Sequence, residues 1–254
     1  MPSAYLLVSH GSRDPRPEIA MQQLARLVSN KAQGNLVKAV GGHITSISEC
    51  DTLVGTANLE LTPKSLHQQI IDFVRNTISP SALQPTSLKI VPLFLMPGVH
   101  VMEDIPHEVA LAQQSLGQDI FIELQPYLGS HSGLEQLWVK QLAATTATAK
   151  IVLAHGSRRW GSQQPVEAIA KKLDAVTAYW AVPPSLESQV QQLIAAGYKQ
   201  IAILPYFLFA GGITDAIAQA TKKLQLHFPE VNFQLAEPLG VSAELADLVW
   251  DLLK

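Results

Sequence analysis

The sequence contains little cysteine and little charge. Cys50 is the only cysteine in 254 residues, so one chain can form no internal disulfide and hold no cysteine-ligated iron–sulfur cluster or zinc ribbon. Charged residues make up 15% of the chain against the usual ~25%, which indicates much buried helix and strand surface. The formal net charge is −3 and lysine and arginine form no long basic run, so we expect no nucleic-acid partner.

Long apolar segments are absent too. No apolar run approaches the ~20 residues that a membrane-spanning helix needs, so we expect no membrane partner. The first residues, MPSAYLLVSHGSRD, have no basic start and only a short apolar stretch, unlike a signal peptide. These absences predict a cytoplasmic protein.

The chain does contain a regular alternation of short apolar runs and amphipathic segments of helical length. The apolar runs predict strands at residues 5–9, 54–61, 88–95, 120–124, 151–154, 175–182, 201–209 and 233–236. The amphipathic segments predict helices at residues 17–29, 63–77, 101–116, 165–173, 184–196, 214–226 and 243–253. Strands that alternate with helices of this length predict an α/β fold with parallel sheets covered on both faces.

The two halves of the sequence repeat each other. SHGSRD at residues 9–14 returns as AHGSRR at 154–159, and PKSLHQQI from Pro63 returns as PPSLESQV from Pro183. PLFLMPG from Pro92 returns as PYFLFAG from Pro205, and QPYLG at 125–129 returns as EPLG at 237–240. Four matches in the same order indicate a duplication, with longer loops in the first copy, notably around residues 34–51.

The duplication predicts two similar lobes. The small-residue stretch AATTATA at residues 143–149 is suited to a linker, which divides the chain into an N-terminal lobe of residues 1–145 and a C-terminal lobe of residues 146–254. We expect a four-stranded parallel sheet flanked by helices in each lobe, and an active-site cleft between the lobes at the strand C-termini, where open parallel sheets bind ligands.

The segment VSHGSRDPRPE is the first candidate for chemistry. An apolar strand leads directly into His10, and Gly11 allows a tight turn before a helical pattern begins, so His10 is expected at the ligand-binding edge. The free N–H groups of the helix start favour an anion, and Ser12 and Arg13 would add a hydroxyl and a cation. The alternative is that Ser12 or Asp14 only caps the helix and that His10 is a partly buried, satisfied histidine.

The segment VPLFLMPGVHVMEDIPHEVA is the second candidate. Its apolar strand ends shortly before His100, which is therefore expected at the same sheet edge as His10. Residues four apart, His100 with Asp104 and Glu103 with His107, could share helix faces. Two imidazoles and a carboxylate suit a transition-type divalent ion better than calcium or magnesium. The alternative is a surface helix start with acids placed at its positive end.

Glu60, in the segment TANLELTPKSL, is the third candidate. An acidic residue within an apolar strand is costly to bury unless it is paired. We therefore expect Glu60 to point toward the same edge of the sheet, where it could bind a metal or accept a proton. The alternative is an exposed position on an edge strand, facing water.

The duplication allows these candidates to be compared within the chain. His10 has the counterpart His155, whereas position 100 corresponds to Ile213 and position 60 to Trp180 by the offsets of the repeated segments. The second lobe thus has apolar residues at two of the three positions. We expect it to be a supporting wall, in which Trp180 or Phe207 stacks against a flat ligand, and we assign the active site to the first lobe.

In chain order, strand–HGS–R, LEL-x-P-x-S-L and VPLFL-x-x-G-x-H-V-x-x-DIP resemble the class II tetrapyrrole chelatases, in particular the long, internally duplicated sirohydrochlorin cobaltochelatases and ferrochelatases. The resemblance covers essentially the whole chain, and GVHVMEDIP is its most specific part. It implies two flavodoxin-like lobes and ATP-independent insertion of Co²⁺ or Fe²⁺ into sirohydrochlorin, in sirohaem or cobalamin biosynthesis. It also implies that His10 and His100 handle the metal, which is a substrate, so no tightly bound cofactor is expected.

The resemblance and the residues together predict the roles of individual side chains. His10 and His100 would bind the metal, and Glu60, with Glu103 as a helper, would complete the charge and accept protons from the pyrrole nitrogens. The carboxylates of the tetrapyrrole would meet hydroxyl and cationic donors. The residues expected to bind the substrate in this way are Ser12, Arg13, Arg158 and Arg159, with Arg16 nearby.

Two other functions are open at this point. A non-catalytic tetrapyrrole or metal carrier would use the same residues without turnover. A phosphoryl-transfer enzyme would use His10 as a nucleophile beside Arg13, although no arginine directly precedes His10. The residues do not distinguish cobalt from iron or nickel, because these ions accept the same ligands. One chain that supplies both lobes is consistent with a monomer.

Overall fold

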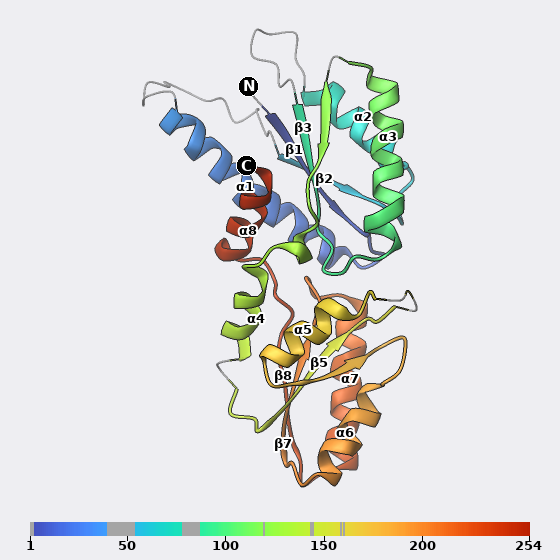
Figure 1. Cartoon of the computed structure of the whole chain (residues 1–254), viewed down its shortest axis with the longest axis vertical. Helices are drawn as coiled ribbons and strands as arrows, with labels where there is room; N and C mark the ends of the chain where they lie inside the picture. Colours follow the sequence, from blue (N-terminus) through green and yellow to red (C-terminus); the bar gives the residue numbers. More distant parts are fainter. Residues whose placement is uncertain are drawn as a thin grey trace. The chain divides into compact units, whose positions relative to one another are not determined.

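The computed structural model describes residues 3–39, 54–77, 87–118, 120–142, 145–157, 159 and 161–254. The chain divides into two compact units, each built around one sheet (Figure 1). Unit 1 comprises Met1–His131 and Val241–Lys254, and unit 2 comprises Ser132–Gly240. Within the described ranges, no helix combines the length and the apolar character needed to cross a membrane.

Unit 1 contains a four-stranded parallel sheet with the strand order β2-β1-β3-β4. Its strands are β1 (Ser3–Ser9), β2 (Val54–Asn58), β3 (Ser87–Pro92) and β4 (Phe121–Leu124). Its helices are α1 (Pro15–Ala39), α2 (Leu66–Thr77), the π-helical turn η1 (His100–Asp104), α3 (Ile105–Leu116), the short η2 (Leu128–Ser130) and α8 (Ala243–Leu253). Helices α2 and α3 cover one face of the sheet, and α1 and α8 cover the other (Figure 1).

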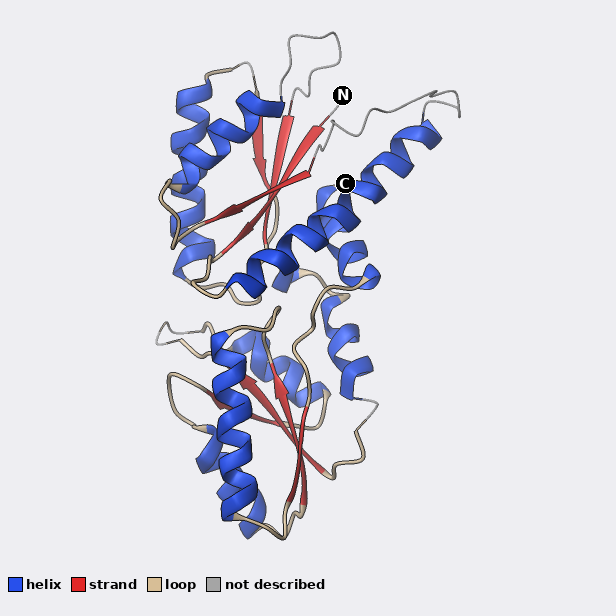
Figure 2. Cartoon of the chain, turned by 180° about the vertical axis from the view of Figure 1, so that it is seen from behind, coloured by secondary structure: helices blue, strands red, loops and turns tan. Residues whose placement is uncertain are grey.

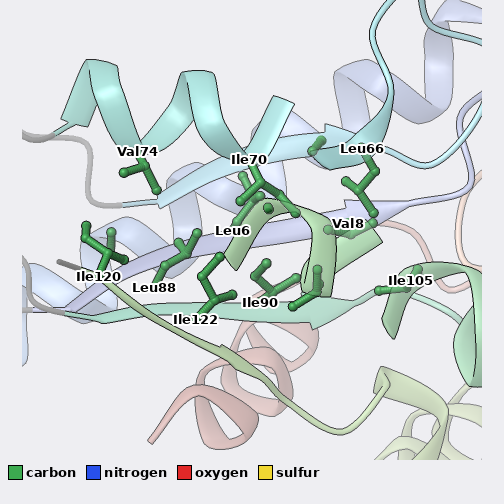
Figure 3. Packing of buried hydrophobic residues seen from close by; sticks show 14 residues of the cluster. Leu6, Val8, Leu66, Ile70, Val74, Leu88, Ile90, Ile105, Ile120 and Ile122 are labelled. Atoms are coloured by element: carbon green, nitrogen blue, oxygen red, sulfur yellow. The ribbon is translucent and has the colours of Figure 1, made fainter. Parts of the chain in front are cut away.

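The central strand β1 is buried on both faces, which explains why its sequence is continuously apolar from Ala4 to Val8 rather than alternating. Leu6 and Val8 point into a cluster with Leu66 and Ile70 of α2 (Figure 3). On the opposite face, the ring of Tyr5 meets the α8 ring Trp250 edge to face at 5.4 Å between centroids. Each fully buried aliphatic side chain of this kind contributes ~1.5–3 kcal/mol to folding.

Unit 2 has the same topology, with the strand order β6-β5-β7-β8. Its strands are β5 (Ala149–Ala154), β6 (Val176–Tyr179), β7 (Gln200–Pro205) and β8 (Asn232–Leu235). Its helices are α4 (Leu134–Leu142), α5 (Gln164–Lys172), α6 (Leu186–Ala195) and α7 (Gly212–His227). Figure 2 shows the strands of this second sheet in red among its blue helices, in the same layered arrangement as in unit 1. The predicted α/β fold with two four-stranded parallel sheets is confirmed.

The compact units differ from the expected lobes at the ends of the two repeats. Helix α4 lies in the first sequence repeat but belongs to unit 2, where the buried Trp138 packs 5.0 Å from the ring of Tyr206. Helix α8 lies in the second repeat but belongs to unit 1, where it buries Leu245 and Trp250. Each repeat therefore places its last helix in the other compact unit, because the apolar face of that helix is buried there.

Several elements also differ in extent from the sequence-based expectation. Helix α4 was not predicted, although Leu134, Trp138 and Leu142 recur at helical spacing. Helix α1 continues to residue 39, through the start of the segment 34–51 expected as a loop, and the rest of that segment lies outside the described residues. Strand β2 ends at Asn58, three residues before the expected end, and the Gln69 side chain bonds to both the N–H and the C=O of Asn58.

Candidate metal centre

Three candidate residues follow three neighbouring strands of the unit 1 sheet at their C-terminal ends. His10 comes directly after β1, Glu60 two residues after β2, and His100 eight residues after β3. In the order β2-β1-β3-β4, the chain passes to opposite sides of β1, which makes the end of β1 a topological switch point. Ligands of open parallel sheets bind outside the strand C-termini at this point.

The side chains of these three residues converge. His10 Nε2 lies 3.9 Å from Glu60 Oε2, and His100 Nε2 lies 4.0 Å from Glu60 Oε1. The two imidazole rings meet edge to face with centroids 4.8 Å apart. An ion held at about 2.1 Å from each of two ligand atoms sets them about 3.0–4.2 Å apart, so one ion fits between the carboxylate and either imidazole.

This cluster is distinct from the other polar groups of the chain. One ligand atom from each of His10, Glu60 and His100 lies within 4.8 Å of the other two, and no other group of three potential ligands meets this criterion in the described ranges. The three side chains are 49%, 48% and 34% exposed, so solvent and a ligand can reach them. The alternative in which His10 is a satisfied, partly buried histidine does not agree with this exposure.

The backbone holds Glu60 beside His10. The N–H of Glu60 donates to the C=O of His10 at 2.9 Å, which extends the pairing of β1 and β2 beyond their ends. Gly11 has a φ of +96°, and a Cβ placed there would lie 2.1 Å from the carbonyl oxygen of Glu60. Only glycine allows this left-handed turn and the close approach of the two chains. Leu61 follows with a φ of +58°, which turns the chain away after Glu60.

Glu60 therefore lies outside the strand in which it was expected. It lies two residues beyond β2 and is half exposed, so it bears no burial cost of the kind assumed from the sequence. Strand β2 is indeed an edge strand, as the alternative supposed. Glu60 nevertheless does not simply face water, because its two carboxylate oxygens approach both imidazoles.

The π-helical turn η1 presents His100 to the cluster. The N–H of Ile105 bonds to the C=O of His100, five residues back. The His100 Nδ1 atom lies 2.7 Å from Asp104 Oδ2, which leaves Nε2 as the nitrogen near Glu60. π-helical turns often occur at functional sites.

Phe94 is a component of the site that the sequence analysis missed. Its ring centroid lies 6.3 Å from that of His10 and 6.2 Å from that of His100, so it packs beside both imidazoles. The signal that could have revealed it is its repeat counterpart Phe207, which the sequence analysis did consider as a ligand contact.

Ser12 and Asp14 make local contacts at the start of α1. Ser12 Oγ accepts a hydrogen bond from the N–H of Asp14 at 3.0 Å, and Asp14 Oδ1 accepts one from the N–H of Arg16 at 3.0 Å. Asp14 also pairs with the Arg16 guanidinium at 2.5 Å, and this side-chain hydrogen bond is the main cause that lowers the pKa of Asp14 to about 2. The bond from the Arg16 N–H agrees with the capping role considered for Asp14, whereas Ser12 bonds to an N–H that precedes the helix.

The remaining predicted residues lie at different places. Arg13 is exposed in the turn after His10. Arg158 lies outside the described residues, and Arg159 is exposed in unit 2, where its N–H donates to Ser157 Oγ. Glu103 is exposed on η1 and is not a member of the three-residue cluster.

The equivalent edge of unit 2 lacks the cluster. His155 is followed by Gly156 with a φ of +80°, as His10 is by Gly11. The N–H of Ala181 donates to the C=O of His155, so the counterpart of Glu60 is Ala181 and the assignment of Trp180 was wrong by one residue. The error arose because the first repeat has one more residue between its strand end and the following proline. The counterpart is apolar in either alignment, and Ile213 stands in place of His100 at the start of α7.

The two aromatic candidates of unit 2 differ in exposure. The side chain of Trp180 is 38% exposed, whereas Phe207 is partly buried against the core of unit 2. Trp180 is therefore the more accessible of the two, and its contact with a ligand stays a prediction.

Comparison with known families gives one match to each repeat. The sequence model of the CbiX family matches residues 4–145 and, a second time, residues 149–254. The chain belongs to the CbiX family. The two matches agree with the internal duplication read from the sequence, and the family agrees with the resemblance to class II chelatases.

Characterised relatives of this CbiX-family chain are sirohydrochlorin chelatases. It is 23% identical to the sirohydrochlorin cobaltochelatase of Priestia megaterium over 260 residues, which covers 96% of this chain and 76% of that protein. It is 25% identical to the sirohydrochlorin ferrochelatase of the same organism over 177 residues, which covers 65% of each chain.

Solved structures share the fold. SirB from Bacillus subtilis with Fe³⁺ has a TM-score of 0.68 at 21% identity, over 100% of this chain and 94% of that one. The CbiX described as the terminal enzyme of siroheme biosynthesis in denitrifying bacteria has a TM-score of 0.59 at 19% identity, over 98% and 97% of the two chains. The fold is therefore that of the chelatases, as expected.

Proposed function

We propose that this CbiX-family chain inserts a divalent metal, Co²⁺ or Fe²⁺, into sirohydrochlorin without ATP. The observation that carries the proposal is the convergence of His10, Glu60 and His100 at the switch point of the unit 1 sheet. The activities named for its cobaltochelatase and ferrochelatase relatives support it.

The cluster suits a metal that must be held and then released. Two neutral imidazoles and one carboxylate bind a transition-type ion through three atoms and leave coordination positions free for water or a pyrrole nitrogen. A closed four-ligand cage would retain the ion. The half-exposed side chains of His10 and Glu60 leave the ion accessible to the macrocycle.

The same residues can manage the protons of the reaction. Inserting M²⁺ into the macrocycle releases two protons from pyrrole nitrogens. Glu60 lies within 4.0 Å of both imidazole Nε2 atoms, so it can accept a proton at the place where the metal leaves its protein ligands. As the ring takes the ion, Glu60 would lose its metal contact and accept one of the two protons, and an imidazole that releases the metal would accept the other.

Further side chains would contact the rest of the substrate. Arg13 and the hydroxyl of Ser12 follow His10 directly and would bind peripheral carboxylates, and Arg158 and Arg159 are proposed for the same role. Leu61, next to Glu60, is 54% exposed and would contact the apolar face of the ring. We further propose that the protein is a monomer, because one chain carries both repeats. We also propose that it acts in the cytoplasm.

An anaerobic absorbance assay with sirohydrochlorin and Co²⁺ or Fe²⁺ tests the proposal. We expect His10→Ala, His100→Ala and Glu60→Gln each to lower the turnover number by about 100-fold or more, since each removes a ligand or a proton acceptor. His155→Ala is the repeat-matched control and should keep most of the activity. Equal losses in all three histidine variants would contradict the assignment of the site to unit 1.

The same assay separates the two rival functions. A carrier would bind the substrates but produce no more than one equivalent of metallated product per chain. A phosphoryl-transfer enzyme would become labelled at His10 by a phosphate donor and would leave metallation at the uncatalysed rate. Either result would overturn the chelatase proposal.

A further inference from the structure

The two histidines of the cluster differ in what holds them. His100 Nδ1 lies 2.7 Å from Asp104 Oδ2, within hydrogen-bond distance. In the described part of the chain, the only carboxylate found beside His10 is that of Glu60, on its Nε2 side. Thus only His100 has an acidic partner on the nitrogen that faces away from the cluster.

The position of Asp104 makes this contact informative. Asp104 is the last residue of η1 and has helical φ and ψ of −69° and −49°, so η1 runs on into α3 as one continuous helical stretch and Asp104 lies inside it. Its side chain makes no capping hydrogen bond. The carboxylate is directed back to His100, four residues earlier on the same helical stretch.

The π-helical turn η1 places the side chains of His100 and Asp104 next to each other. His100 begins η1 and Asp104 ends it, and the Ile105 N–H bonds to the His100 C=O across the widened turn. The Asp104 side chain is 44% exposed and that of His100 is 34% exposed, so the pair lies at the rim of the cluster. No burial requirement forces the two together.

We propose that Asp104 is a positioning residue for His100, an inference that rests on the proposed chelatase function. By accepting a hydrogen bond from Nδ1–H, Asp104 holds the tautomer whose lone pair is on Nε2 and fixes the ring so that this lone pair faces Glu60 and His10. A carboxylate on the far nitrogen also makes an imidazole a stronger donor to a metal. His100 is then the oriented ligand, and His10 is the ligand without this support.

The inference is tested with the full chain and Co²⁺ alone as the probe, in the absence of sirohydrochlorin. We expect Asp104→Ala to weaken Co²⁺ binding by about 10–100-fold, measured by titration of the cobalt absorbance bands. Asp104→Asn keeps an acceptor oxygen and should recover part of the loss. Asp72→Asn is the matched control, because it removes an exposed carboxylate of α2 that pairs with Lys64. This variant should bind Co²⁺ like the unaltered chain.

A spectroscopic measurement separates positioning from general stability. The ¹⁵N shifts of His100, assigned by comparison with His100→Ala, should show the Nδ1–H tautomer in the unaltered chain and in Asp104→Asn, and a mixture in Asp104→Ala. Unchanged Co²⁺ affinity and an unchanged tautomer in Asp104→Ala would overturn the inference, even if metallation proceeds. Conversely, if the unaltered chain binds Co²⁺ but does not metallate sirohydrochlorin, the proposed function fails while the role of Asp104 stands.

Discussion

At the scale of single residues, the start of α1 shows how one carboxylate can bond to both the backbone and the side chain of the same residue. Asp14 accepts the N–H of Arg16 and pairs with its guanidinium, and the arginine lowers the pKa of Asp14 to about 2. Because the folded pKa lies below the value of about 4 expected in the unfolded chain, the pair stabilises the fold above that pH. The contribution is lost as the pH falls toward 2.

Replacing the arginine tests this assignment. In Arg16→Gln the pKa of Asp14 should rise toward its ordinary value, because the charged side-chain donor is gone while the backbone N–H bond remains. A ¹³C titration of the Asp14 carboxyl group measures the change. Lys64→Gln, in the loop before α2, is the control and should leave the titration of Asp14 as it was. A pKa that stays near 2 in Arg16→Gln would show that the guanidinium is not the cause.

The cluster itself was foreseen at this scale only in part. His10 and His100 were predicted because each follows an apolar strand, and Glu60 because it was expected as an acid within one; parallel strands end at one edge of a sheet. That Asp104 bonds to the far nitrogen of His100 was not predicted, since four-residue spacing shows a shared face but not a side-chain rotamer. The packing of Phe94 beside both rings was missed for the same reason.

At the scale of elements, the strand-to-loop turn after β1 determines where Glu60 lies. A methyl group on Gly11 would collide with the Glu60 carbonyl at 2.1 Å, and its φ of +96° is disfavoured for any other residue. The same backbone turn recurs at Gly156, where a methyl group would meet Val182 Cγ2 at 2.6 Å. The two turns thus share a conformation but have different neighbours.

We therefore expect both Gly11→Ala and Gly156→Ala to lower the free energy of unfolding by at least about 1–2 kcal/mol, because both force alanine into a left-handed conformation. Only Gly11→Ala should also weaken Co²⁺ binding, since it displaces the segment that carries Glu60. Urea denaturation and cobalt titration measure the two effects. A similar loss of Co²⁺ affinity in Gly156→Ala would refute the separation between the two turns.

At the scale of the whole molecule, the two repeats are not independent in their packing. Helix α8 closes one face of unit 1, where Lys31 pairs with Asp247 at 2.5 Å and Lys89 Nζ donates to the C=O of Leu253 at 2.9 Å. The ring of Trp250 packs against that of Tyr5. The last helix of the sequence thus completes the unit that holds the candidate metal centre.

Trp250→Ala should consequently destabilise unit 1 by about 3 kcal/mol or more, because a nearly buried indole is removed from the sheet face. Hydrogen exchange should rise in α1 and β3, the elements that α8 contacts, and much less in the strands of unit 2. Val139→Ala, at an exposed position of α4, is the control and should change little. Faster exchange in the unit 2 strands instead would contradict the placement of α8.

The sequence by itself determined the α/β class, the duplication, the order of strands and helices apart from α4, and the choice of His10, Glu60 and His100 as candidates. These follow from apolar periodicity and from internal repetition, which are properties of the chain alone. Only the tertiary structure decided which unit the last helix of each repeat joins, that Ala181 rather than Trp180 matches Glu60, and that Asp104 lies within hydrogen-bond distance of His100. The reason is physical, since these features depend on which surfaces are buried together and on side-chain rotamers, and neither is determined by local spacing.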